Sequence, residues 1–218
     1  MNLLPDLPTL ALFLVATVTL NVTPGPDMLY VIANSIGLGR KAGVVSALGI
    51  GGGTLVHTFA GALGLSALLM SSATAFDLVR YAGAVYLLYL GIRSFMSKEA
   101  QIVAGRVPQI PLGTVFKRGV ATNVLNPKVA LFFLAFLPQF VDPSRGAVIL
   151  QFLLLGTMFN LSGTLVNTIV ALLVGFAGDR FADNPGFAWL QRWFTGSVFV
   201  ALGARLALAG DIGLDSSE

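Results

Sequence analysis

The sequence contains no cysteine and only one histidine, and charged residues make up 11% of its 218 positions. Without cysteine, the chain has no disulfide, no thiolate metal site and no thiol redox chemistry. In a soluble domain about a quarter of the residues are charged. The scarcity of charge therefore argues against a soluble protein.

Hydrophobic residues, by contrast, make up 56% of the chain, and the mean hydropathy is +0.84. Residues 42–76 and 146–178 contain no Asp, Glu, Lys or Arg at all. Each of these stretches exceeds the roughly 20 residues that a membrane-spanning helix needs. We therefore predict an all-α integral membrane protein in which residues 1–218 form a single transmembrane domain.

The hydrophobic runs predict six transmembrane helices, at residues 7–37, 42–70, 74–95, 115–139, 146–177 and 189–209. The N-terminal segment lacks the basic start of a signal peptide, so we expect residues 7–37 to be retained as the first span. The longest polar connection is 96–114, and residues 210–218 form a short acidic tail.

Three pairs of similar stretches occur in the same order on the two sides of the 96–114 connection. GTLVHT (53–58) and GTLVNT (163–168) agree at five of six positions, and NVTPGPD (21–27) resembles NVLNPK (123–128). The third pair places arginines 13 positions apart, at 80 and 93 and again at 192 and 205. The pattern predicts a three-helix repeat, residues 1–95 and 115–209. Because three is odd, the second copy is inverted, which gives a 3+3 inverted-topology repeat.

The basic residues predict how the spans are oriented, because lysine and arginine concentrate on the cytoplasmic side. One side holds only Arg80, Arg145 and Arg205, whereas the other holds nine residues: Arg40, Lys41, Arg93, Lys98, Arg106, Lys117, Arg118, Arg180 and Arg192. We therefore expect residues 96–114 in the cytoplasm and both termini outside.

Helix-breaking residues interrupt two of the spans near their middles: Pro24, Gly25 and Pro26 in the first, and Pro127 in the fourth. Proline removes a backbone donor and clashes with the preceding turn, and glycine weakens a helix further. Unpaired backbone groups are tolerated in a membrane only inside protein or beside a water-filled cavity, so the two breaks should face each other near the midplane. A polar residue followed by proline is typical of a helix start. Thr23–Pro24 and Asn126–Pro127 are therefore the predicted starts of the second half-helices.

Asp27 and Lys128 occupy matching positions just after the two breaks. An aspartate in a first helical turn complements the helix dipole, so capping explains Asp27 as well as ligand binding does. A lysine has the wrong sign there and costs about 2.5 kcal/mol or more at membrane depth, so Lys128 needs compensation from Asp27 or from a bound anion. A zwitterion would satisfy both: Lys128 and the half-helix N-termini would hold its carboxylate, while Asp27 would accept an ammonium group or a proton.

The candidate binding residues are Asp27, Lys128, Asn126, Asn21, Asn123 and Thr23, and Asp27 is also the candidate for proton coupling. For His57 we favour an interhelical hydrogen bond over a proton relay, because its partner in the repeat is an amide, Asn167. The Gly49-xxx-Gly53 spacing predicts close helix packing, and we expect the same role for the glycines at 156, 163 and 203.

The chain resembles the LysE/RhtB family of bacterial amino-acid exporters. The resemblance covers essentially the whole sequence and is carried by the length, the six spans, NVTPGPD in span one, the glycine-rich second span and NPK at 126–128. It implies a protein of the bacterial inner membrane that exports amino acids or their derivatives, driven by the proton motive force. Asp27 and Lys128 match the charged positions of the family's motifs. The substrate side chain is not implied.

Other classes of function fit the sequence less well. An intramembrane enzyme lacks support, because neither H-E-x-x-H nor G-x-S-x-G occurs. An exporter or channel for an inorganic ion is the alternative, although the scarcity of acidic residues within the spans argues against a multivalent cation site. The basic residues lie in short loops, which does not favour nucleic acid. We expect membrane lipids and a small-molecule substrate as partners. We expect neither a cofactor nor a bound metal. The sequence is compatible with a homo-oligomer as well as with a monomer.

Overall fold

The computed structural model describes residues 4–65, 73–96 and 110–177, together with isolated positions between 193 and 207. Every regular element within these residues is helical, which confirms the predicted all-α class. Two unbroken helices and two bent helix pairs in this part of the chain are long and apolar enough to cross a membrane.

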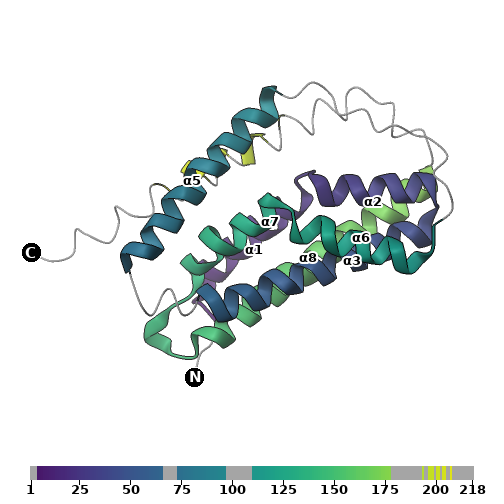
Figure 1. The fold of residues 1–218 in the computed structure, drawn as a ribbon. Coiled ribbons are helices and arrows are strands. Elements are labelled where there is room, and N and C mark those ends of the chain that lie inside the picture. The colour runs from purple at the N-terminus through teal and green to yellow at the C-terminus, as the bar shows by residue number, and fades with distance from the viewer. Residues whose placement is uncertain are drawn as a thin grey trace, which may run out of the picture.

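The bent pairs correspond to the first and fourth predicted spans (Figure 1). In the first, α1 (Leu7–Val22) and α2 (Pro26–Gly37) meet at 47°. In the fourth, α6 (Leu112–Val124) is followed at 48° by α7 (Pro127–Leu131), which continues through a π-helical turn (Phe132–Phe136) and a 3-10 turn (Leu137–Phe140). Both predicted breaks are therefore present, and the two bends are nearly equal.

The unbroken helices correspond to the second and fifth predicted spans. These are α3 (Arg40–Ala60), which continues through a π-helical turn (Gly61–Leu65), and α8 (Val148–Ala177). The third predicted span, 74–95, coincides with α5 (Ala73–Met96), which carries Arg80 and Arg93. The sixth, 189–209, lies outside the described residues apart from isolated positions.

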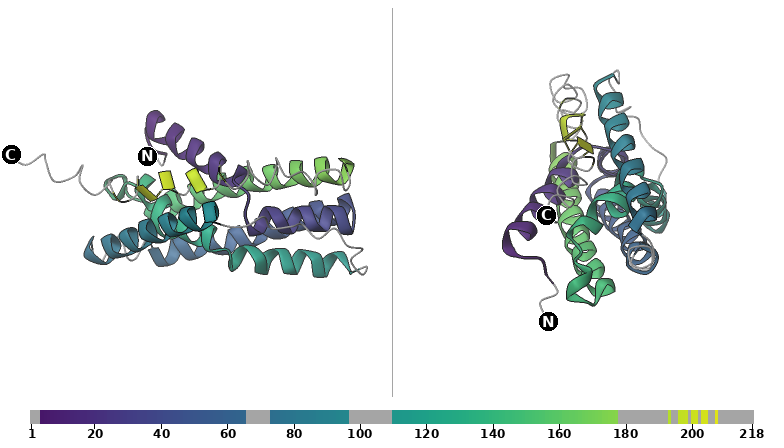
Figure 2. Two further views of the ribbon diagram at one scale, coloured as in Figure 1. Left: turned by 90° about the horizontal axis from the view of Figure 1, so that it is seen from above. Right: turned by 90° about the vertical axis from the view of Figure 1, so that its left-hand side faces the viewer.

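The helices form a bundle in which α3 and α8 run side by side along most of the length (Figures 1 and 2). At one end α3 packs against α2 and α6, and α8 packs against α2. At the other end α8 packs against α1, and α5 lies against α7 and the π-helical turn that follows it. The breaks in the bent pairs therefore lie in the middle of the bundle, between its two ends.

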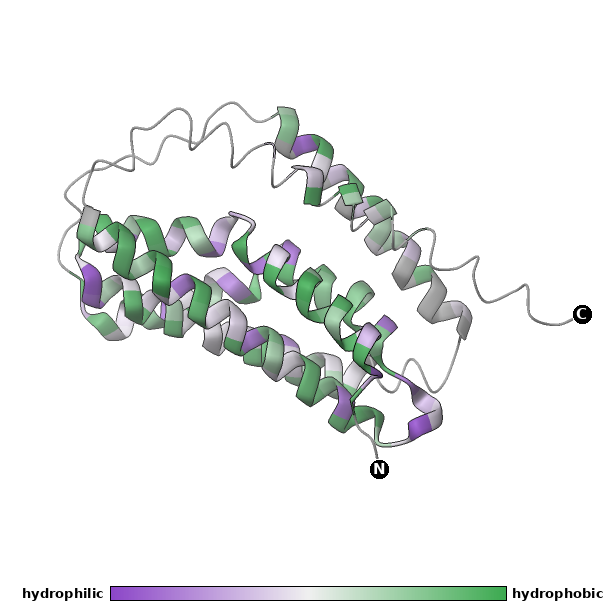
Figure 3. Cartoon of the chain, turned by 180° about the vertical axis from the view of Figure 1, so that it is seen from behind, coloured by the Kyte–Doolittle hydropathy of each residue, from purple (hydrophilic) through white to green (hydrophobic). Residues whose placement is uncertain are grey.

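Large apolar side chains cover much of the outer surface of the described helices. Leu7, Phe176, Leu165 and Val15 are each more than 60% exposed. Hydrophobic residues line most of each helix, while hydrophilic residues gather at helix ends and beside the breaks (Figure 3). Exposed apolar surface on this scale is expected where a protein faces lipid rather than water.

Glycines bring α3 and α6 into backbone contact. A Cβ atom at Gly49 would lie 2.5 Å from the carbonyl oxygen of Phe116, and one at Gly53 would lie 2.7 Å from the Cβ of Asn123. Both distances are shorter than any ordinary contact, so only glycine fits. The predicted close packing at Gly49 and Gly53 is confirmed. Three further positions show close approaches of an added Cβ atom: Gly156 at 2.5 Å from Thr58, Gly203 at 2.9 Å from Leu88, and Gly163 at 3.0 Å from Asn21.

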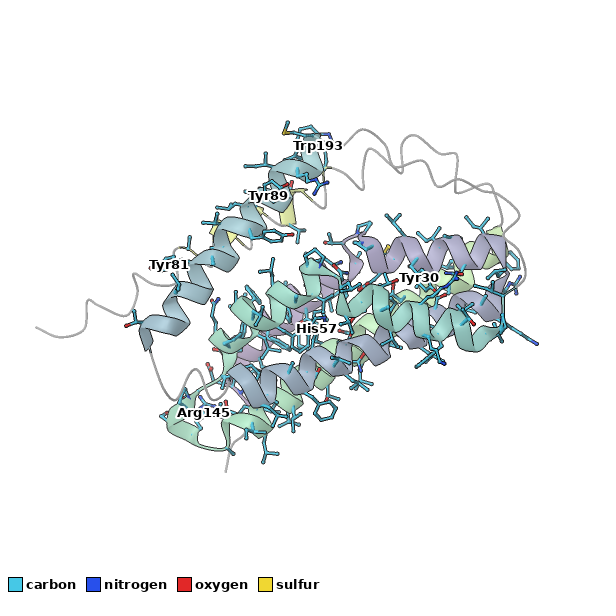
Figure 4. All side chains as sticks on the ribbon, in the orientation of Figure 1. Tyr30, His57, Tyr81, Tyr89, Arg145 and Trp193 are labelled. Carbon is cyan, nitrogen blue, oxygen red and sulfur yellow. The ribbon has the colours of Figure 1, made fainter. Side chains whose placement is uncertain are left out.

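The loop before α8 is held by a polar cluster at one end of the bundle, where Figure 4 labels Arg145. Arg145 donates to the Asp142 carboxylate at 2.9 Å and to the carbonyl of Leu4 at 2.7 Å. The Ser144 hydroxyl, followed by the Arg145 guanidinium, holds the pKa of Asp142 below its ordinary value. The cluster thus ties the loop to the chain just before α1.

Candidate functional site

The break between α1 and α2 is built from residues 23–25. Thr23 ends α1, because both its backbone N–H and its hydroxyl donate to the carbonyl of Thr19, at 3.0 and 2.6 Å. Gly25 then precedes the first residue of α2, Pro26, whose missing N–H is harmless at that position. The prediction that the second half-helix starts at Thr23–Pro24 was wrong, because Thr23 closes α1 with these bonds and the later proline, Pro26, starts α2.

The break between α6 and α7 follows the predicted pattern. Asn126 caps α7 by accepting a hydrogen bond from the backbone N–H of Lys128 at 3.0 Å, and Pro127 is the first helical residue. The prediction of a helix start at Asn126–Pro127 is confirmed. The cap also occupies one of the backbone donors that we expected to face an anion.

Lys128 extends from α7 across the break of the other bent pair. Its side chain is only 7% exposed, and its ammonium group donates to the carbonyls of Leu20 at 3.1 Å and Thr23 at 2.8 Å. Gly25 lies beside this side chain: a Cβ atom there would be 3.4 Å from the ammonium nitrogen. In this arrangement the lysine binds backbone carbonyls at the C-terminal end of α1, where the helix dipole is negative.

Asp27 makes the reciprocal crossing, from α2 to the end of α6. It is 6% exposed, and its Oδ2 accepts a hydrogen bond from the side-chain amide of Asn123 at 2.7 Å. Its Oδ1 makes no hydrogen bond of ordinary geometry with the described residues, although the side-chain amide of Asn126, which is likewise without a partner, interacts with this carboxylate. Asp27 lies in the first turn of α2, where its charge complements the helix dipole, although no side chain makes a capping hydrogen bond there.

Asn123 connects this carboxylate to α3. Thr54 donates to its side-chain oxygen at 3.3 Å, and the Nε2 of His57 lies 3.1 Å from its backbone carbonyl. The His57 ring also stacks on Phe133 at 5.8 Å, in the middle of the bundle (Figure 4). The predicted interhelical hydrogen bond of His57 is confirmed.

Asn21, the repeat counterpart of Asn123, connects α1 to α8. Its side-chain amide donates to the Ser162 hydroxyl at 2.9 Å and to the carbonyl of Phe159 at 3.3 Å. The two helices can approach closely here because position 163 is glycine; a Cβ atom added at that position would lie 3.0 Å from the Asn21 side-chain oxygen. Each of the two asparagines therefore ties one half-helix to one of the unbroken helices.

A small cavity of about 20 Å³ lies between the two breaks. Four of the six predicted binding residues line it, namely Asn21, Asp27, Asn123 and Lys128. Thr23 and Asn126 do not line it; they hold the backbone of the two breaks. A cavity of this size has room for about one water molecule.

The sequence interpretation missed three polar residues of the cavity wall: Thr54 on α3, and Thr164 and Asn167 on α8. All three belong to the paired stretches GTLVHT and GTLVNT. Their repetition was the available signal, but it was used only to infer the duplication. Asn167 is 6% exposed, and its side-chain oxygen has no partner among the described residues.

An apolar groove of about 420 Å³ lies next to the polar cavity, between α2 and α8. Its walls include Val22, Ile32, Val170 and Leu173. Met28 lines both the groove and the polar cavity. The two spaces therefore adjoin at a single flexible side chain.

Metal binding finds no support in the described part of the chain, where no three His, Cys, Asp or Glu side chains are grouped as ligands. Paired helix breaks, two buried charges that cross between them and a lipid-facing surface instead define a membrane protein of the transporter type. The family model of the LysE type translocators matches residues 18–210. The chain belongs to this family.

Three similar proteins agree with this family assignment. The leucine efflux protein of Salmonella typhimurium is 30% identical over 196 residues, which cover 89% of this chain and 92% of the relative. The leucine efflux protein of Enterobacter sp. (strain 638) is 32% identical over 190 residues, covering 85% and 89%. An uncharacterized membrane protein of Bacillus subtilis, YrhP, is 29% identical over 197 residues, covering 86% and 93%. No solved structure matches the chain.

Proposed function

We propose that this protein is a secondary active exporter of amino acids in the bacterial inner membrane. The observation that carries the proposal is the pair of buried, oppositely charged side chains, Asp27 and Lys128, on one cavity between two helix breaks. Charges at membrane depth are costly and are retained for function. Membership of the translocator family and the names of the leucine efflux relatives support amino acids as the cargo.

The carrier is proposed to be a 3+3 inverted repeat. Bends of 47° and 48° in the two broken helices support it. So does the matched packing of the repeated stretches, because Gly53 of GTLVHT lies against Asn123 and Gly163 of GTLVNT lies against Asn21. Asp27 and Lys128 each cross to the end of the opposite first half-helix, as expected for related halves.

Lys128 is proposed to exchange partners during transport. In the present state its ammonium group binds two carbonyls of α1. A substrate carboxylate that approaches Lys128 offers the same ammonium a charged acceptor, and charge-assisted hydrogen bonds are about twice as strong as neutral ones. Binding would thereby release the end of α1 and couple the occupied site to movement of that half-helix.

The groove beside the cavity supports a substrate with an apolar side chain. Its walls are apolar, and among the described residues only Met28 lines both the groove and the polar cavity that contains Asp27 and Lys128. An amino acid such as leucine would place its charged end beside Asp27 and its aliphatic side chain past Met28. This is also the cargo in the names of the relatives.

Proton coupling through Asp27 is part of the proposal. The carboxylate is buried, and one of its oxygens is free of hydrogen bonds among the described residues, so a proton can be added there without breaking the bond to Asn123. Asp27→Asn keeps the size of the side chain and removes its charge. We expect this variant to lose acceleration of efflux by an imposed proton gradient; a variant that still responds would remove Asp27 from this role.

The whole proposal is tested by efflux from cells loaded with a panel of amino acids as dipeptides, with and without the protein. We expect faster efflux of apolar amino acids, leucine among them. Absence of an effect on every amino acid would overturn the proposal and favour the inorganic-ion alternative. Orientation is tested separately: a reporter that is active only in the cytoplasm should be silent when it is fused after Ser217, since both termini are proposed to lie outside.

A further inference from the structure

Two side chains that line the same small cavity each carry a buried oxygen atom without a hydrogen-bond partner among the described residues. One is Oδ1 of Asp27 on α2, and the other is Oδ1 of Asn167 on α8. Both side chains are only 6% exposed. A buried acceptor without a donor destabilises the folded state, so a ligand that donates hydrogen bonds to both oxygens would remove that cost.

The repeat makes the state of Asn167 unusual. Its counterpart His57 bonds to the asparagine at the end of α6, Asn123. The corresponding asparagine on the other side, Asn21, instead donates to Ser162 and to the carbonyl of Phe159. The Asn167 side-chain oxygen is an acceptor, so it cannot make the donor bond of His57; it has no partner among the described residues, and its side chain lines the cavity.

We infer that Asn167 and Asp27 together form the subsite for the α-ammonium group of the substrate. An ammonium group carries three N–H donors and is close to a water molecule in size, which matches both the two free acceptors and a cavity of about 20 Å³. Lys128 would then bind the carboxylate of the substrate, and the substrate's side chain would lie beside Met28. The inference rests on the proposed function and adds a residue, Asn167, that selects for a primary amine.

The test compares leucine with an analogue that lacks the ammonium group. Purified protein is reconstituted in liposomes, and leucine exchange is measured together with its inhibition by 2-hydroxy-4-methylpentanoate, in which a hydroxyl group replaces the ammonium. Asn167→Ala removes one acceptor from the subsite. We expect the KM for leucine to rise about tenfold, equivalent to about 1.4 kcal/mol, while inhibition by the hydroxy acid changes less than about twofold.

Two further variants separate binding from folding. Asn167→Asp keeps an acceptor oxygen and should restore a KM within about threefold of the wild type. Asn34→Ala is the matched control: Asn34 donates to the carbonyl of Tyr30 within α2, does not line the cavity, and should leave both measurements unchanged.

The outcomes distinguish this inference from the proposed function. Wild-type protein that exchanges no amino acid overturns the proposed function and the subsite with it. If the wild type is active but Asn167→Ala weakens leucine and the hydroxy acid equally, Asn167 is a structural residue and the inference fails. A requirement for sodium that disappears in Asn167→Ala would also overturn it, since the cavity would then hold a metal cation.

Discussion

The contact between Gly53 and Asn123 provides a sharp test of how packing supports the site. A methyl group added at Gly53 would lie 2.7 Å from the Asn123 Cβ and 2.8 Å from the carbonyl oxygen of Val120. Carbon atoms in contact are normally about 3.5–4.0 Å apart, and the Val120 oxygen belongs to the rigid backbone of α6. Gly53→Ala must therefore push α6 away from α3 by about 1 Å.

That displacement acts directly on Asp27. The Asn123–Asp27 hydrogen bond of 2.7 Å would lengthen to about 3.7 Å, beyond the range of about 3.2 Å for such bonds. Overpacking costs about 1–3 kcal/mol, which lowers the unfolding midpoint of a chain of this size by about 2–12 °C. We expect Gly53→Ala to show this loss in detergent and, in addition, at least a tenfold fall in leucine exchange in liposomes.

The neighbouring glycine supplies the control. A Cβ atom at Gly52 would lie 3.2 Å from a methyl group of Val120 and 3.3 Å from the ring end of Phe116, both of which are side-chain atoms that can move. Gly52→Ala should therefore stay close to the wild type in both assays. Equal behaviour of Gly53→Ala and Gly52→Ala would refute the argument that backbone contact between α3 and α6 positions Asn123.

The remaining predictions concern the charged groups and Met28. Lys128→Met should reduce leucine exchange more than about a hundredfold, because it removes the proposed partner of the substrate carboxylate and leaves the buried Asp27 charge uncompensated, at a cost of about 3–5 kcal/mol; a folded variant with normal exchange would show that the lysine only caps α1. Met28→Ala should raise the rate for phenylalanine relative to leucine about tenfold by widening the passage to the groove, and an unchanged ratio in a substrate panel would place the side chain elsewhere. Asp142→Asn should lower the unfolding midpoint at neutral pH, since the pKa of Asp142 is depressed in the folded state. That difference should vanish as the pH falls below the ordinary value of 3.8, which thermal unfolding over a pH series measures.

The fold was predictable where the sequence contains residues with a strong backbone preference. Prolines and glycine predicted both breaks, and the asparagine before Pro127 predicted the cap of α7. The start of α2 was misplaced by two residues, because Thr23 can begin a helix or end one. In the structure it ends α1, through two bonds to the carbonyl of Thr19.

The site was predictable as a set of charges but not as a set of contacts. The positions of Asp27 and Lys128 after the breaks identified them as candidates. Their partners were not identified, because Lys128 binds backbone carbonyls, which every residue possesses. Asn167 was overlooked for a related reason: its importance comes from an acceptor left without a donor, and only the folded packing reveals that.

The broken first span has a consequence for how the protein is made. With 12 residues, α2 is about 18 Å long, too short to cross a hydrocarbon core of about 30 Å by itself. It must therefore enter the bilayer together with α1. The carbonyls of Leu20 and Thr23 then leave the ribosome more than 100 residues before Lys128 does. The acceptors of the lysine are therefore synthesised before the lysine itself, and we expect insertion of the first half to assist insertion of the second.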